Sequence, residues 1–265
     1  MTDFSGQDLR DSRFHRVDLT GSDFSFADLA HARFRDTALR HVVMRGVELE
    51  DVEISGELLN VRINGVDVAP LVEAELDRLD PDRPKMRPTE PDGFREAWDL
   101  VERLWAGTVE RARRLERVDP GLLHESVGGE WSFIETLRHL AFATDAWVRR
   151  GVQGDPTPWH PLDLPWDGMK DTPGVPRDRE ARPTLDEALE LRHDRMATVR
   201  RVVDRLTEDE LDRATTPVDA AGWPPPGESF PVRECLLVVL NEEWYHRLFA
   251  ERDLDVLEAR TSEPG

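Results

Sequence analysis

A strict five-residue repeat of large apolar residues dominates the first sixty residues of the chain. It occupies twelve successive positions, namely Phe4, Leu9, Phe14, Leu19, Phe24, Leu29, Phe34, Leu39, Met44, Leu49, Ile54 and Leu59. A period of five belongs to neither an α-helix nor an ordinary β-strand. It predicts a solenoid whose coils stack one inward-pointing side chain above another. Small residues two positions earlier, such as Ser12 and Ala27, fit so narrow an interior.

These residues resemble the pentapeptide-repeat family, whose right-handed quadrilateral β-helix takes four such units per coil. The twelve units would make about three coils, the minimum for a stacked core. Beyond Leu39 a valine replaces the small residue, and the pattern fades before the turn-forming pair Asn64 and Gly65. The resemblance implies a β-helix over residues 1–68.

Composition limits the classes of function. The formal net charge of −20, from 55 acidic and 35 basic residues, argues against sequence-independent binding of nucleic acid. The single cysteine, Cys235, excludes an internal disulfide framework and is compatible with a reducing compartment. The chain opens without a basic and apolar leader, and its longest aliphatic run is only Cys235 to Leu240. We therefore expect a cytoplasmic protein with no signal peptide and no membrane span.

Closely spaced prolines separate the repeat from the remainder of the chain. They are Pro81, Pro84, Pro88 and Pro91. Because proline interrupts helices and central strands, we expect a linker over residues 69–91, with a short helix at its start. A helical domain over residues 92–256 and a disordered tail over residues 257–265 complete the expected organisation.

Helical periodicity and capping signals predict four helices in the second domain. They cover about residues 93–116, 132–150, 184–203 and 231–252. Ser132 with Glu135, and Thr184 with Glu187, have the spacing of capping boxes. Two long loops rich in proline connect these helices, the first of them spanning residues 154–183. The pattern is typical of a four-helix bundle, so the expected fold class is α+β: a β-helix followed by a bundle.

Two polar residues interrupt the apolar face of the last predicted helix. Glu242 and His246 stand four residues apart, where the core-facing stripe continues. A buried carboxylate must be offset by a partner, a proton or a metal ion. His139 on the second helix can project toward the same interior. Two imidazoles and one carboxylate from facing helices predict a divalent-metal site.

Other interpretations of these residues remain open. A Glu and a His at this spacing often form only a local hydrogen bond. Glu243 is also within reach of His246 and competes with Glu242. Of the other histidines, His124 and His193 are typical of structural or exposed positions, whereas His160 could visit the site if its loop folds over.

Two stretches resemble the DinB-like family, particularly its branch of mycothiol-dependent maleylpyruvate isomerases. They are Gly129-Glu130-Trp131-Ser132-Phe133-Ile134-Glu135-Thr136-Leu137-Arg138-His139-Leu140 and Asn241-Glu242-Glu243-Trp244-Tyr245-His246. The resemblance covers roughly residues 92–254 and implies a four-helix bundle with His139, Glu242 and His246 as metal ligands. Many members have a histidine where this chain has Glu242. The C-terminal substrate domain of the isomerases has no clear counterpart here.

The resemblance implies a reaction as well as a metal. Zinc is favoured, and nickel or iron suit the same donors. A bound metal lowers the pKa of a thiol or of water. Because Cys235 opens an aliphatic run in the expected core, a low-molecular-weight thiol such as mycothiol would come from outside.

We therefore expect a metal-dependent thiol S-transferase. Its metal-bound thiolate would attack a small electrophile under the 154–183 loop. Arg138, Arg149, Arg150 and Arg247 flank the expected site, with Arg138 and Arg247 assigned to cofactor binding, and no residue is assigned as catalytic. A hydrolase that uses bound water is one alternative. A non-catalytic interaction module, with a structural metal and a repeat segment that docks a partner, is the other. For the repeat segment itself we expect that it covers one face or edge of the bundle or mediates a homodimer.

Overall fold

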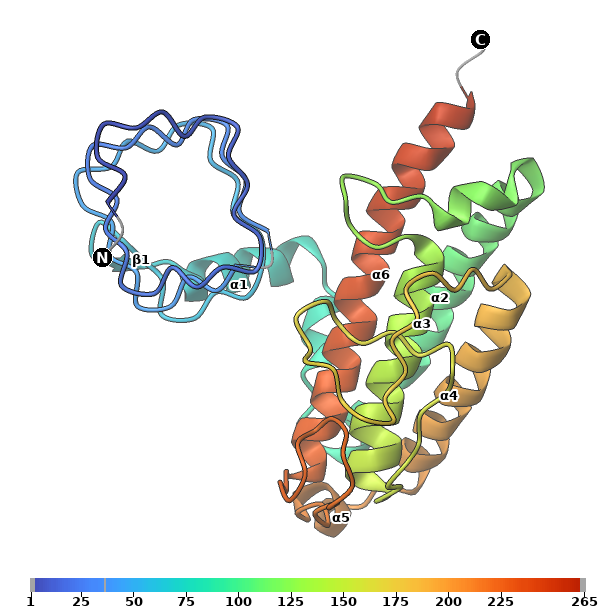
Figure 1. The fold of residues 1–265 in the computed structure, drawn as a ribbon. Helices are drawn as coiled ribbons and strands as arrows, with labels where there is room; N and C mark the ends of the chain where they lie inside the picture. The colour runs from blue at the N-terminus through green and yellow to red at the C-terminus, as the bar shows by residue number, and fades with distance from the viewer. Residues whose placement is uncertain (1–2, 36, 263–265) are drawn as a thin grey trace. The chain divides into compact units, whose positions relative to one another are not determined.

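The computed structural model describes residues 3–35 and 37–262. The chain divides into two compact units, Met1–Glu57 and Leu58–Gly265. The first unit is a coil, and the second contains the helices (Figure 1).

The five-residue repeat is a repeat of backbone turns. From residue 6 to residue 56, every fifth described residue has a positive φ, as in Gly21 (76°) and His31 (61°). Each of these residues lies two places after a large apolar one. Several of the turns are closed by a backbone hydrogen bond, such as that from Ser22 N–H to the Leu19 carbonyl at 3.0 Å. The corners of the coil are thus set by short-range geometry within each unit of the repeat.

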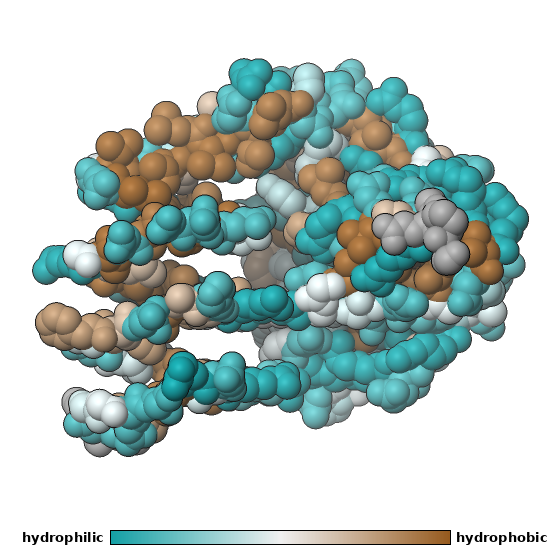
Figure 2. Space-filling view, turned by 90° about the horizontal axis from the view of Figure 1, so that it is seen from above, coloured by the Kyte–Doolittle hydropathy of each residue, from teal (hydrophilic) through white to brown (hydrophobic). Residues whose placement is uncertain are grey.

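The expected stacked core of this coil is not found. Phe4 is 51% exposed and Ile54 is 68% exposed, and the other described residues of the unit are exposed as well. The successive turns of the coil stand apart in the space-filling view (Figure 2). Residues 3–35 and 37–57 also contain no β-strand. The five-residue period of turns is present, but the stacked apolar core is not. A turn depends only on residues within one repeat, whereas a buried column of side chains requires contact between successive coils.

A short hairpin opens the second unit. Strands β1 (Arg62–Ile63) and β2 (Val66–Asp67) pair antiparallel around the turn at Asn64 and Gly65. Both turn residues have positive φ, 49° and 83°. The turn expected from this pair is confirmed.

The segment expected to be a linker is ordered. It contains the helix α1 (Ala69–Leu79) and the 3-10 helix η1 (Arg83–Met86). Arg83 is buried and bonds to Glu73 and Asp77 of α1 and to the Tyr245 hydroxyl at 3.1 Å. This network ties the segment to the helical unit, so the boundary between units falls after Glu57 and not within residues 69–91.

Four long helices pack around one apolar core in the second unit (Figure 1). Helices α2 and α3 each pack against both α4 and α6. The helices after η1 are α2 (Pro91–Val118), η2 (Pro120–His124), α3 (Phe133–Thr144), η3 (Asp145–Val152), α4 (Leu185–Arg205), α5 (Glu208–Asp212) and α6 (Val232–Ser262). Among the described residues, none of these helices has the length and apolar character needed to cross a bilayer.

Both predicted capping boxes are present. The Ser132 hydroxyl accepts from Glu135 N–H at 3.3 Å, and the Glu135 carboxylate accepts from Ser132 N–H at 2.8 Å. Thr184 and Glu187 make the same pair of bonds at the start of α4. The second predicted helix changes character before its end, because the chain continues from α3 as the π-helix η3.

The expected disordered tail is helical through Ser262. Leu254 and Leu257 are buried against the core. Arg111 of α2 forms ion pairs with Asp255 at 2.5 Å and Glu258 at 2.7 Å. These contacts between helices hold the end of α6, so the tail prediction is wrong for residues 257–262, and residues 263–265 lie outside the described part of the chain.

Candidate metal centre

The structure brings together the three residues that the sequence predicted as ligands. His139 comes from α3, and Glu242 and His246 lie one turn apart on α6. Their potential ligand atoms all lie within 4.8 Å of one another. Glu242 Oε2 is 3.2 Å from His139 Nε2 and 3.0 Å from His246 Nε2. This arrangement could hold one metal ion.

A backbone carbonyl fixes the orientation of His139. Its Nδ1 lies 2.9 Å from the Leu164 carbonyl oxygen. A carbonyl can only accept, so Nδ1 carries a proton, and the Nε2 of a neutral ring points a lone pair at the Glu242 carboxylate. A cation, either a proton or a metal ion, must separate these two acceptors. Metal-binding histidines characteristically donate their second ring nitrogen in this way, so the residues present fit a metal.

The protonation of the cluster also suits a cation. Burial alone would raise the pKa of Glu242, but its close contacts with His139 and His246 outweigh burial and hold that pKa far below its ordinary value. Burial lowers the pKa of His246, so its imidazole is neutral at pH 7. Neutral imidazole and ionised carboxylate are the forms that ligate metals.

Aromatic rings surround the cluster on several sides. Trp131 stacks on His246 with ring centroids 5.6 Å apart and planes at 9°, and it lies 4.4 Å from His139. The Phe249 ring meets His246 edge-on at 5.9 Å and is itself 43% exposed. The Glu242 side chain is 30% exposed, so the cluster is reachable from solvent. The sequence motif contains Trp131 but does not indicate that its ring packs on both histidines, because that contact depends on how α3 and α6 pack together.

The competing residues have other partners. Glu243 is buried and pairs with Arg192 of α4 through both carboxylate oxygens, one of them at 2.7 Å. His193 is exposed on α4. His160 accepts from Leu162 N–H at 3.2 Å within its own loop, so it does not join the cluster. Glu242 is therefore the carboxylate of this site.

The contacts of Arg138 lie within the protein and do not test its expected role in binding a cofactor, which stays a prediction. The side chain is buried, and it donates to the carbonyls of Leu162 at 2.8 Å, Asp178 at 2.5 Å and Ala181 at 3.3 Å. All three acceptors belong to the 154–183 loop. The guanidinium is thus occupied in fastening this loop to α3, next to His139.

Two other arginines that were expected near the site also have partners within the protein. Arg150 donates to the carbonyls of Pro156, Ala220 and Pro224, and so holds both long loops. Arg247 lies over the Trp244 ring with its guanidinium carbon 5.6 Å from the ring centroid. No contact here tests its expected role in cofactor binding, which stays a prediction.

The only cysteine is buried beside η3. Cys235 is 0% exposed, and burial raises its pKa to about 11. Its Sγ would lie 3.5 Å from a side-chain carbon placed on Gly151. A protonated thiol in the core does not supply a nucleophile, as the sequence predicted.

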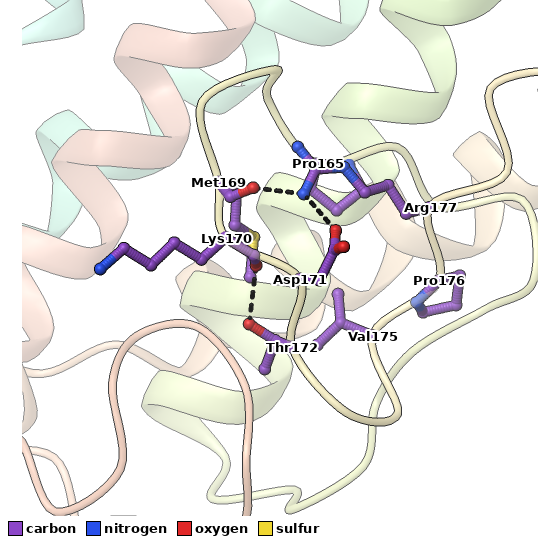
Figure 3. Close-up of a pocket in the computed structure, with 8 residues that line it drawn as sticks. All are labelled: Pro165, Met169, Lys170, Asp171, Thr172, Val175, Pro176 and Arg177. Carbon is purple, nitrogen blue, oxygen red and sulfur yellow. Dashed lines mark hydrogen bonds and ion pairs between the residues drawn. The ribbon is translucent and has the colours of Figure 1, made fainter. Parts of the chain in front are cut away.

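A cavity of about 150 Å³ lies within the 154–183 loop, apart from the three ligand candidates. Its lining residues are Pro165, Met169, Lys170, Asp171, Thr172, Val175, Pro176 and Arg177 (Figure 3). Arg177 donates to Asp171 at 2.9 Å and to backbone carbonyls of the loop, while the Lys170 side chain extends away from the other lining residues. The Arg177 guanidinium group therefore bonds to other residues of the same loop.

Comparison with known proteins agrees with this architecture. The family model of the DinB superfamily matches residues 100–250, more than half of the chain. The model of Pentapeptide repeats, in eight copies, matches residues 2–36 and 22–56. Neither the curated proteins nor the solved structures include a match. The chain therefore belongs to the DinB superfamily and carries pentapeptide repeats at its N-terminus.

Proposed function

We propose that the helical unit binds one divalent metal ion and uses it to transfer a small thiol to a small electrophilic substrate. The ligands are His139 Nε2, Glu242 Oε2 and His246 Nε2. The observation that carries the proposal is their convergence within 4.8 Å, with the His139 tautomer fixed by a carbonyl. Membership of the DinB superfamily supports a metal-binding protein independently.

The donor set favours zinc, and nickel and iron suit it too. Three protein ligands leave a position of a tetrahedral site for an external molecule. A divalent cation there would lower the pKa of a thiol or of water bound to it. Because Cys235 is buried and protonated, the thiol comes from outside the chain as a low-molecular-weight compound such as mycothiol.

The chain's own residues have distinct tasks in this proposal. Leu164 orients His139 through its carbonyl, and the Glu242 carboxylate balances the charge of the cation. Trp131 and Phe249 form an apolar wall that accommodates the carbon skeleton of the substrate. Arg138 keeps the 154–183 loop closed beside the site.

We also propose a specific architecture for each of the two units. Helices α2, α3, α4 and α6 form a DinB-like four-helix bundle, and the repeat forms a quadrilateral β-helix once its coils close up. The repeat segment then provides a surface for homodimerisation. The acidic net charge of −20 makes nucleic acid an unsuitable partner.

Metal content tests the site. We would purify the protein without an affinity tag and measure bound metals in the wild type, in a His139→Ala, His246→Ala double variant, and in His193→Ala. His193 is an exposed histidine of the same unit, so that variant controls for loss of any histidine. We expect about one equivalent of metal in the wild type and in His193→Ala and little in the double variant.

Absence of metal from all three proteins, even after divalent ions are added, would refute the proposal and favour an interaction module. If metal is bound, substrate screens with and without added thiol separate the two enzymatic possibilities. Turnover that requires the thiol supports S-transfer. Turnover without it identifies a hydrolase that uses bound water.

A further inference from the structure

A carboxyl group of the 154–183 loop is buried without a cation of its own. Asp163 is 0% exposed, and it directly precedes Leu164, whose carbonyl accepts from His139. Its Oδ2 accepts from His160 N–H at 2.8 Å. Its Oδ1 has no hydrogen-bond donor among residues 3–35 and 37–262.

The arginine side chains near Asp163 are already paired with a second buried acidic residue, Asp145. Asp145, the first residue of η3, is also 0% exposed. Arg195 of α4 contacts both of its oxygens at 2.8 Å, and Arg149 contacts it at 3.2 Å. The Asp145 and Asp163 carboxyl groups lie within hydrogen-bonding reach of each other.

Two buried carboxylates within hydrogen-bonding reach of each other are not both ionised, because each lacks solvation and the charges repel. Asp145 is the one stabilised by guanidinium groups, so the proton belongs on Asp163. Burial, followed by the charge of Asp145, raises the pKa of Asp163 well above its ordinary value. The O–H group of a protonated Asp163 donates a hydrogen bond to an Asp145 oxygen. Two ionised carboxylates would have no such donor.

We propose that Asp163 is a neutral carboxylic acid that latches the 154–183 loop onto η3 and thereby positions the Leu164 carbonyl against His139. Only the consequence for His139 as a ligand rests on the proposed function. Asp163 is a positioning residue, since it acts through Leu164. The other titratable and charged groups around the pair are Arg149, Asp155, His160, Asp194 and Arg195.

The latch couples closure of the loop to one proton. Below the ordinary pKa of an aspartate, about 4, the acid is neutral whether the loop is open or closed, and closure is at its strongest. As the pH rises toward the elevated pKa of the closed state, the open state loses its proton first, so closure weakens by up to about tenfold per pH unit.

Hydrogen exchange of the loop amides across pH 5–8 tests the latch in metal-free protein, after correction for intrinsic exchange. The variants are Asp163→Asn, whose amide donates without titrating, and Asp163→Ala, which has no donor. Asp171→Asn is the matched control, because Asp171 is an exposed carboxylate of the same loop. We expect opening to increase with pH in the wild type and in Asp171→Asn, to stay low and nearly flat in Asp163→Asn, and to be high throughout in Asp163→Ala.

A wild-type loop whose opening does not depend on pH would overturn the latch without the need for any variant. An Asp163→Asn profile parallel to that of the wild type would overturn it as well. Zinc titration then tests the link to His139: Asp163→Ala should bind 10- to 100-fold more weakly than the wild type, with Asp163→Asn close to the wild type. If no protein binds zinc while the exchange profiles behave as expected, the proposed function fails and the latch stands.

Discussion

Replacing Arg192 by methionine would leave the Glu243 carboxylate alone in the core. The pair joins α4 to α6, and the two side chains are 2% and 1% exposed. The guanidinium carbon of Arg192 also lies 5.0 Å from the centroid of the Trp105 ring, so α2 takes part as well. Methionine keeps much of the arginine's length and apolar volume, so the main change is the loss of charge and hydrogen bonds.

Breaking one half of a buried ion pair typically costs about 3–5 kcal/mol, because the remaining charge is neither solvated nor paired. For a unit of this size, each kcal/mol shifts the melting temperature by about 2–4 °C, so we expect a fall of roughly 6–20 °C. The double replacement Arg192→Met, Glu243→Leu removes both charges. It should recover at least about 2 kcal/mol of the loss, because apolar substitutes for a buried pair are often neutral or stabilising.

Urea unfolding of metal-free protein, followed by tryptophan fluorescence, measures these differences. Arg200→Met is the control on the same helix, since Arg200 pairs with Asp99 and Glu102 at the surface. It should cost no more than about 1 kcal/mol. If the double variant is as unstable as Arg192→Met, the cost comes from lost packing on Trp105, and the reasoning from unpaired charge is refuted.

Two further predictions follow from the buried titratable groups. Cys235 in the native protein should react with a thiol reagent at pH 7 on the order of a hundredfold more slowly than in denatured protein, because its pKa is raised to about 11 and the side chain is 0% exposed; rapid labelling of native protein would contradict this. Metal-free protein should lose stability as the pH falls below about 6.5, since the lowered pKa of His246 means that the unfolded chain takes up the proton first. His246→Gln should remove that component of the denaturation curve, and identical pH dependence in the two proteins would show that His246 does not cause it.

The elements that the sequence predicted well depend on short-range rules. The capping boxes at Ser132 and Thr184 need only residues three positions apart, and the shared face of Glu242 and His246 needs only one helical turn. His139 could be added because a helix facing α6 was already expected. Local patterns therefore sufficed for the helix starts and for the composition of the candidate site.

The predictions from the sequence were wrong where the local structure depends on residues far apart in the chain. Pro91 begins α2 and does not end a linker. Proline suits both roles, and the packing of the residues that follow, such as the buried Trp98, decides between them. The end of α6 depends on ion pairs with Arg111, which lies far away in sequence. The partners of Arg138 are backbone carbonyls, which carry no sequence signal at all. No local pattern announced the π-helix η3 either.

The way in which the two long loops are fastened has a consequence for how this protein can change. Arg138 and Arg150 donate hydrogen bonds to main-chain carbonyl oxygens of the loops, and every amino acid supplies such an oxygen. Substitutions at the accepting positions can therefore alter the chemistry of the loop surface while the anchor survives, provided the backbone keeps its course. Random libraries confined to loop positions such as Leu162 and Ala181 should yield many folded proteins, so the surface of these loops can diversify while the fold beneath them is kept.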